Sequence, residues 1–316
     1  MEHLPGSQQP VFFTEVGPRD GLQNLAQTLG TEAKLALVER LLDSEVDQVE
    51  AASFVSPRWV PQMADAEELL ARLVAARGRG VMHRLRVLVP NPKGLERALE
   101  AGARHVVANL GVTESFNRRN LNHSVEETVS ELAGMAGVAR SSGCVFDVGL
   151  SVAFGCPFEG RVDKDRVAEL ADACQELGAV EIGIADTIGV ADPLQVSSLV
   201  EHLVRAGIPT EQMALHFHDT RGMGLANALA AYEGGVRRFE GSVGGIGGCP
   251  FAPRATGNVC SEDLLYMLER AGAGVTADVG SLCQTAQHLE EVLGERLPGR
   301  LYRAGVWSGA PAGAAD

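Results

Sequence analysis

The feature that most constrains the fold is an alternation of short apolar runs with longer helical patterns, from residue 11 to about residue 270. The short runs are rich in Val, Ile and Leu, which is typical of strands buried on both faces of a parallel sheet. Eight such strands are expected, at 11–16, 46–52, 84–89, 104–109, 145–152, 179–185, 212–217 and 236–241. Helical periodicity covers 31–43, 62–77, 92–101, 124–141, 162–177, 192–205, 223–233 and 261–272.

Eight strand–helix pairs in roughly 260 residues match the usual size of a (β/α)8 barrel. A doubly wound sheet would more often show fewer strands and a glycine fingerprint after the first one. We therefore predict an α/β fold with a (β/α)8 TIM barrel over residues 11–273. A flexible N-terminus over 1–10 is expected to precede the barrel. A C-terminal helical extension with a mobile tail, over 274–316, is expected to follow it.

Composition excludes several classes of protein. The chain has 316 residues, with 27 Lys and Arg against 41 Asp and Glu, which gives a formal net charge of −14. This acidic balance disfavours nucleic acid and anionic membranes as partners. No apolar run reaches the length of a membrane helix, and the N-terminal MEHLPGSQQP lacks the features of a signal peptide. We therefore expect a cytoplasmic protein. Its six scattered cysteines, without a CxxC pair, are typical of free thiols.

Unusual polar residues gather at the expected C-terminal ends of the strands, where a barrel of this kind builds its active site. The first strand is followed by EVGPRDGLQN (15–24). The seventh ends in HFHDT (216–220), and the eighth leads into a glycine loop, GGIGGCP (244–250). These three segments are the candidates for a functional site.

His216 and His218 are two residues apart on the expected seventh strand, so both imidazoles project to the same face and can bind one ion. Strands one, seven and eight are neighbours in a closed barrel, which brings Asp20 within reach of that ion. Two histidines, an oxygen ligand and open positions suit Mg²⁺, Mn²⁺ or another divalent ion that polarises substrate oxygens. The alternative is that both histidines are ordinary surface or core residues, the commoner fate of a His-x-His pair.

The other candidate residues each have two interpretations. Glu50 and Glu181 are carboxylates in apolar segments, which is typical of ion pairs inside a barrel mouth. Arg19 is either their partner or a group at a strand end that stabilises a developing enolate oxygen. The glycine loop either closes the fold or brings the backbone close to a substrate. Its Cys249 is either packed or catalytic.

Together these segments resemble the 3-hydroxy-3-methylglutaryl-CoA (HMG-CoA) lyases, a branch of the metal-dependent lyase and Claisen-condensation barrels. The resemblance covers nearly the whole chain. The His-x-His-Asp and Arg-Asp-Gly pieces are shared with the wider superfamily, including isopropylmalate and homocitrate synthases. The segments VGPRDGLQN (16–24), SFVSP (53–57) and GGCPFAP (247–253), the last followed by Gly257-Asn258, resemble the lyase branch specifically.

The resemblance implies a set of metal ligands. It implies that Asp20, His216 and His218 hold a divalent ion, Mg²⁺ or Mn²⁺, and that Asn258 lies at or near the coordination shell. It also implies a small acyl-CoA thioester as the substrate and a place in leucine catabolism. We expect a homodimer, because barrels with an added C-terminal helix commonly pair.

The resemblance further implies a retro-Claisen cleavage of HMG-CoA to acetyl-CoA and acetoacetate by a carbon–carbon lyase. Arg19 would bind the thioester carbonyl and stabilise the enolate of the departing acetyl-CoA, while Glu50 would organise the site. Cys249 would cap the pocket and take part in proton transfer. By the same resemblance, the base would be Asp20 or a water on the metal, and the acid would be Cys249 or a water.

Some positions differ from the pattern of these lyases. Phe158 stands where a tyrosine is usual, and Thr113 and His123 are also atypical. Their segments follow the fourth and fifth strands and should border the acyl pocket. A lyase for a related 3-hydroxy-3-alkylglutaryl-CoA therefore stays open, as does a Claisen-condensing synthase of the same superfamily. A non-catalytic binding barrel is the remaining alternative, although it would require a broken set of site residues.

Overall fold

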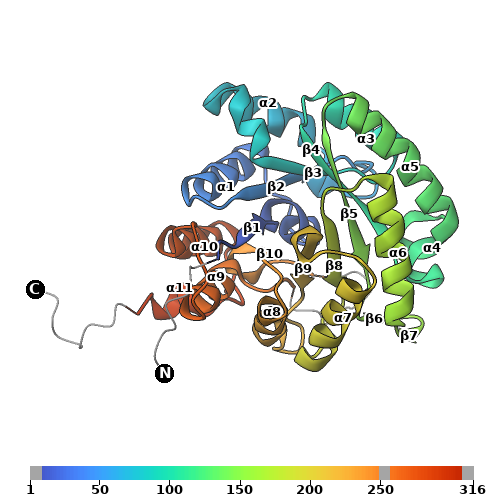
Figure 1. Ribbon diagram of the computed structural model, residues 1–316. Coiled ribbons are helices and arrows are strands. Elements are labelled where there is room, and N and C mark those ends of the chain that lie inside the picture. Colours follow the sequence, from blue (N-terminus) through green and yellow to red (C-terminus); the bar gives the residue numbers. More distant parts are fainter. Residues whose placement is uncertain (1–8, 249–256, 308–316) are drawn as a thin grey trace, which may run out of the picture.

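The computed structural model describes residues 9–248 and 257–307. Within them, eight parallel strands close into a barrel in the order β1-β10-β9-β8-β5-β4-β3-β2, surrounded by helices (Figure 1). The strands are β1 (Phe12–Glu15), β2 (Gln48–Ser53), β3 (Leu85–Leu88), β4 (His105–Gly111), β5 (Val145–Ser151), β8 (Ile182–Asp186), β9 (Met213–Phe217) and β10 (Arg238–Gly241). Each coincides with one of the eight strands expected from the sequence, so the predicted (β/α)8 barrel is confirmed.

The helices around the barrel follow most of the predicted ranges closely. They are α1 (Thr31–Asp43), α2 (Ala66–Arg77), α3 (Pro92–Glu100), α4 (Glu114–Leu121), α5 (Val125–Ser141), α6 (Lys164–Leu177), α7 (Pro193–Arg205), α8 (Gly224–Glu233), α9 (Ser261–Arg270), α10 (Val279–Leu293) and α11 (Leu301–Ala304). Among the described residues, no helix combines the length and the apolar composition that crossing a bilayer requires.

Two features after β4 and β5 were not expected. The first is α4, whose sequence ESFNRRNL is mostly polar and therefore has no apolar periodicity. The helix is instead secured by tertiary contacts, because it buries Phe116 and because the Asn117 side chain accepts a 2.8 Å hydrogen bond from the backbone N–H of Gly111. The second is an antiparallel hairpin formed by β6 (Gly155–Cys156) and β7 (Gly160–Arg161).

Strand β5 shows how a barrel strand divides its two faces. Successive side chains of a strand point to opposite sides. Asp147, Gly149 and Ser151 line the central pocket. The alternate residues Phe146 and Leu150 are buried and do not border the pocket, which places them on the helix-facing side. The helix-facing side of this strand is therefore apolar, whereas its inner side carries polar and small residues.

The C-terminal helices brace the loop that follows β10. Helix α10 lies between α9 and α1 and contacts both (Figure 1). The segment after it reaches the glycine loop, where the backbone N–H of Gly299 donates a 3.0 Å hydrogen bond to the carbonyl of Gly244. Residues 1–8 and 308–316, which hold most of the expected flexible N-terminus and part of the expected tail, lie outside the described residues. The domain boundaries at 10/11 and 273/274 stay predictions.

Candidate active site

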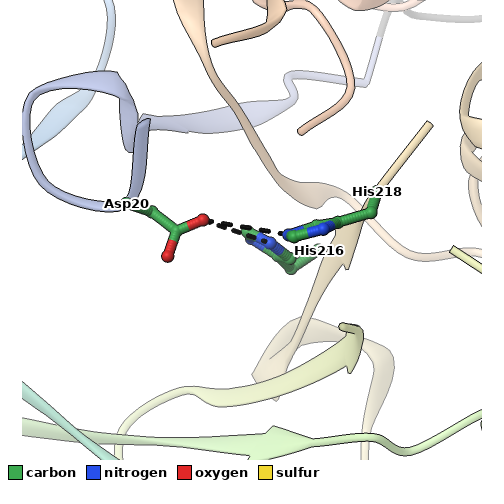
Figure 2. A group of neighbouring side chains, drawn as sticks. All are labelled: Asp20, His216 and His218. Atoms are coloured by element: carbon green, nitrogen blue, oxygen red, sulfur yellow. Dashed lines mark ion pairs between the residues drawn. The ribbon is translucent and has the colours of Figure 1, made fainter. Parts of the chain in front are cut away.

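The structure brings together the three residues for which the sequence predicted a metal site. Asp20 lies in a turn directly after β1, His216 lies in β9, and His218 follows that strand. One oxygen of Asp20, Oδ2, is 4.0 Å from His216 Nε2 and 3.8 Å from His218 Nε2. The three candidate ligand atoms all lie within 4.8 Å of one another, and Figure 2 shows the carboxylate pointing at both imidazoles. This spacing is compatible with one ion shared by the three side chains.

Asp20 is positioned by a π-helical turn, Gly17–Gly21. Short π-helical segments occur often at functional sites. The turn packs tightly against the loop after β10, since a Cβ at Gly21 would lie only 2.7 Å from Ile246 Cγ1. Glycine is therefore required at this position for the turn to approach the loop.

A buried carboxyl group, Glu15, ties this turn to the same loop. Its Oε1 accepts hydrogen bonds from the backbone N–H groups of Gly17 at 2.7 Å and Val243 at 2.9 Å. The Ser261 hydroxyl, at the start of α9, donates to Oε2 at 2.5 Å. Burial raises the pKa of Glu15 to about 8, although these hydrogen bonds oppose the shift.

The imidazole of His216 is held in orientation by Glu240, which lies on the side of the ring away from Asp20. Its Nδ1 lies 2.8 Å from Glu240 Oε2. When the ring is neutral and Nδ1 donates to this carboxylate, Nε2 is unprotonated and faces Asp20. A carboxylate behind a histidine is a common arrangement at metal sites, because it fixes the tautomer and raises the basicity of the ligand nitrogen. His218 is also buried, at 4% exposure.

Asn258 lies beside the candidate ligands. Its Nδ2 donates to Asp20 Oδ2 at 3.0 Å and to the carbonyl of Ile246 at 3.2 Å. Its Oδ1 is buried and has no hydrogen-bond partner among the described residues. The nearby Gly247 allows this contact, since a Cβ there would meet Asn258 Nδ2 at 2.7 Å.

These donors fit a divalent ion. Two imidazoles and a carboxylate are common metal ligands, and the unpartnered Asn258 oxygen adds another oxygen nearby. Burial favours the neutral carboxyl group, but the Arg19 guanidinium and the two imidazoles hold the pKa of Asp20 well below its usual range. Asp20 is therefore ionised at neutral pH, as a metal ligand must be.

Arg19 makes the ion pairs expected of a charged residue in the barrel mouth. Its Nη1 donates to Asp20 Oδ1 at 2.6 Å, and its Nε donates to Glu50. Glu50 is fully buried in β2. Among the described residues, Nη2 of Arg19 has no hydrogen-bond partner, and Arg19 lines the central pocket. The same guanidinium is therefore held in place by two carboxylates and still has a donor available for a ligand.

The structure also shows site residues that the sequence analysis missed. Arg86, in β3, is 2% exposed and lies at the centre of a network of carboxylates. It pairs with Glu50 Oε2 at 2.7 Å, with Glu181 Oε1 at 3.0 Å and with Glu240. Burial lowers the pKa of this guanidinium, but the carboxylates around it raise it well above the ordinary value. The available signal was the presence of charged residues, Arg86 and Glu240 among them, inside the expected strands 84–89 and 236–241.

The pocket in the barrel mouth has a volume of about 150 Å³ and joins these groups. Its lining includes Arg19, Asp20, Glu50, His216 and His218. Gly248 of the glycine loop also borders it. The predicted site residue Cys249 lies outside the described residues.

These features define a TIM-barrel protein with a candidate site for a divalent metal ion at the carboxyl ends of its strands. The family model described as HMGL-like matches residues 10–289, and the chain belongs to this family. The resemblance to the HMG-CoA lyases noted in the sequence is confirmed by the relatives and solved structures that follow.

The chain is similar to the (R)-citramalyl-CoA lyase of Chloroflexus aurantiacus, with 41% identity over 94% of this chain and 95% of that protein. It is equally similar to the hydroxymethylglutaryl-CoA lyase of Pseudomonas mevalonii, with 41% identity over 90% of this chain and 93% of that protein. A solved HMG-CoA lyase from Acinetobacter baumannii, in complex with coenzyme A and 3-methylmalate, is 36% identical and has a TM-score of 0.90. That comparison covers 98% of this chain and 99% of the other.

Proposed function

We propose that this protein is a divalent-metal-dependent carbon–carbon lyase that cleaves HMG-CoA to acetyl-CoA and acetoacetate. The observation that carries the proposal is the convergence of Asp20, His216 and His218 beside the Arg19 guanidinium, in a chain of the HMGL-like family. The names of the relatives support the reaction class. The homologous complex with coenzyme A supports an acyl-CoA thioester as the substrate.

The reaction breaks the bond between C2 and C3 of the acyl chain. The C3 hydroxyl loses its proton and becomes the ketone of acetoacetate. The bonding electrons stay on C2 as the enolate of acetyl-CoA, which then takes up one proton. A divalent ion would supply Lewis-acid polarisation of the substrate oxygens. The protein must therefore stabilise an enolate oxygen, accept one proton and deliver another.

Arg19 is suited to the enolate oxygen. Two of its donors are used by Asp20 and Glu50, which fix the guanidinium, while Nη2 has no partner among the described residues. A donor held in place before the reaction stabilises developing negative charge without a cost of reorganisation. We therefore assign Arg19 to the thioester carbonyl, and Glu50 to holding Arg19 in position.

The metal ligands in this proposal are Asp20, His216 and His218, with Asn258 at or near the coordination shell. Mg²⁺ and Mn²⁺ both suit a site with imidazole and carboxylate ligands. The proton acceptor is Asp20 or a water molecule. The proton donor is Cys249, as the family resemblance implies, or a water molecule.

A second candidate function is the cleavage of (R)-citramalyl-CoA, favoured by the relative from Chloroflexus aurantiacus. The same bond cleavage would then give acetyl-CoA and pyruvate. The two thioesters can be offered separately to the protein loaded with Mg²⁺ or Mn²⁺ under a thiol reductant, with His216→Ala as the negative control. Formation of acetoacetate from HMG-CoA at a turnover number of roughly 1 to 10³ s⁻¹ supports the proposal. Pyruvate from citramalyl-CoA with no acetoacetate from HMG-CoA contradicts it and favours the second candidate.

We further propose that the protein forms a homodimer and that it is located in the cytoplasm. Light scattering of the purified chain tests the oligomeric state. A mass near twice the 33.3 kDa of one chain supports the dimer, and a mass near 33.3 kDa contradicts it.

A further inference from the structure

Three strands carry small or polar residues at one level of the pocket wall. Gly149 of β5 is the register partner of Asn109 of β4 and of Gly183 of β8, and all three line the pocket. The interior of a TIM barrel is usually filled at each level by bulky branched side chains. Two neighbouring glycines therefore leave a hollow in the wall. We refer to Asn109, Gly149 and Gly183 as the side recess.

No side chain fills the space in front of Gly183. A Cβ at this position would have only backbone atoms of the described residues within 4 Å, Gly149 Cα at 3.2 Å and the Val148 carbonyl oxygen at 3.8 Å. In front of Gly149, the nearest atom is Asn109 Oδ1, 3.0 Å from the position of a Cβ. The recess is thus bounded by backbone on two strands and by one neutral amide.

The side recess lies just below the candidate metal ligands. His216 is the register partner of Ala185, and Gly183 is two residues earlier on the same strand, a step of about 6.6 Å toward the barrel floor. All these residues border one continuous pocket. A group attached to the reacting carbon of a bound substrate can therefore extend from the level of His216 into the recess.

The charges below the recess restrict what can occupy it. One step further down lie Asp147 of β5 and Glu181, which directly precedes β8. They are linked by a 3.1 Å hydrogen bond from the Glu181 backbone N–H to Asp147 Oδ1. Both side chains are buried and line the pocket. Arg86 pairs with both of them, but it also pairs with Glu50 and Glu240, so four carboxyl groups share this one cation. An anionic group in the recess would find no free positive charge here, whereas an uncharged chain needs none.

We propose that the side recess receives an uncharged substituent longer than methyl on C3 of the substrate. The protein would then cleave 3-hydroxy-3-alkylglutaryl-CoA thioesters with a longer alkyl group. This inference rests on the proposed function, because it uses the same step. The C2–C3 bond breaks, the hydroxyl loses its proton, and C2 gains one. The products are acetyl-CoA and a 3-oxo acid that keeps the alkyl group.

The test compares kcat/KM for HMG-CoA and for 3-hydroxy-3-butylglutaryl-CoA with the Mg²⁺-loaded protein. Gly183→Val fills the recess and Gly183→Ala fills it partly. The matched control is Gly134→Ala, at a glycine of α5 where a Cβ meets no atom within 4 Å beyond the backbone of its own helix. In the wild type, we expect the two kcat/KM values to lie within about tenfold of each other. The ratio of butyl to methyl substrate should fall at least about tenfold in Gly183→Val, less in Gly183→Ala, and stay unchanged in Gly134→Ala.

Three outcomes would overturn the inference. Cleavage of HMG-CoA without cleavage of the butyl substrate removes it and leaves the proposed function standing. Cleavage of neither substrate overturns the proposed function and this inference with it. If neither Gly183 variant changes the ratio of kcat/KM for the butyl substrate to that for HMG-CoA, the substituent binds elsewhere. Circular dichroism and the melting temperature report whether Gly183→Val folds, and Gly183→Ala carries the test if it does not.

Discussion

Arg19 Nη1 donates a 2.6 Å hydrogen bond to Asp20 Oδ1, while the other oxygen of this carboxylate faces His216 Nε2 at 4.0 Å. Two residues adjacent in the chain therefore present opposite charges to one pocket. The cation keeps the carboxylate ionised, and the carboxylate holds the cation in place. In the proposed reaction, this contact places the enolate-stabilising donor next to the candidate metal ligand.

Replacing Arg19 by Met should abolish turnover without removing the metal site. The loss of a preorganised oxyanion donor costs on the order of 3 kcal/mol or more in transition-state stabilisation. Steady-state rates with HMG-CoA and metal content by atomic emission check both parts, with Arg72→Met as a surface control. Near-normal activity in Arg19→Met would remove the proposed role.

Replacing Glu240 by Ala should weaken metal binding about 10- to 100-fold, because His216 loses the carboxylate that fixes its tautomer. Calorimetric titration of the metal-free protein with Mn²⁺ measures this directly. Glu240→Gln keeps a carbonyl oxygen that can accept from the imidazole, so it should lose less. Equal Mn²⁺ affinities for Glu240→Ala and the wild type would show that this contact does not tune the site.

Replacing Arg86 by Met should destabilise the fold by about 3–5 kcal/mol, because several buried carboxylates lose their common partner. Urea unfolding measures the change in the free energy of unfolding. The control is Arg72→Met, since the ion pairs of Arg72 with Glu32 and Glu68 are solvent-exposed and should contribute little to stability. Similar losses for both variants would contradict the central place of Arg86.

Glu15 should make the fold less stable as the pH rises. Its pKa is about 8 in the folded protein against an ordinary value of 4.5, so between these values the folded state holds a proton that the unfolded state has lost. Stability from this group is therefore lost as the pH rises from about 4.5 to 8, by up to about 1.4 kcal/mol per pH unit.

Glu15→Gln imitates the neutral carboxyl group and does not titrate. Urea unfolding at pH 5.5 and pH 8 should show that its stability relative to the wild type improves at the higher pH. The exposed Glu269→Gln serves as the control and should show no such trend. If the difference in the free energy of unfolding between Glu15→Gln and the wild type is the same at both pH values, Glu15 is not protonated in the folded protein.

The barrel and its candidate ligands could be predicted from the sequence for a physical reason. Strands buried on both faces are apolar runs, and closure of the barrel makes the first and the last strands neighbours. Once eight runs are counted, Asp20 after the first strand must lie near His216 on the seventh. The His216–His218 spacing then places both imidazoles on the inner face.

The other features of the site and the fold could not be predicted. They depend on contacts between segments that are distant in the sequence, and local periodicity gives no information about such contacts. Arg86 and Glu240 are charged residues within strands of the barrel, and nothing nearby in the sequence shows that they meet. The π-helical turn at Gly17–Gly21 arises from packing against the loop after β10. Helix α4 lacks an apolar stripe and is held by tertiary contacts such as that of Asn117.

The central claim is that metal bound at Asp20, His216 and His218 is required for cleavage of HMG-CoA. The most direct measurement is the rate of acetyl-CoA and acetoacetate formation by the metal-stripped protein, before and after Mg²⁺ or Mn²⁺ is added back. The account predicts negligible cleavage by the stripped protein and recovery to roughly 1 to 10³ s⁻¹ on reloading. An undiminished rate without metal, or failure of the protein to bind either ion, would contradict it.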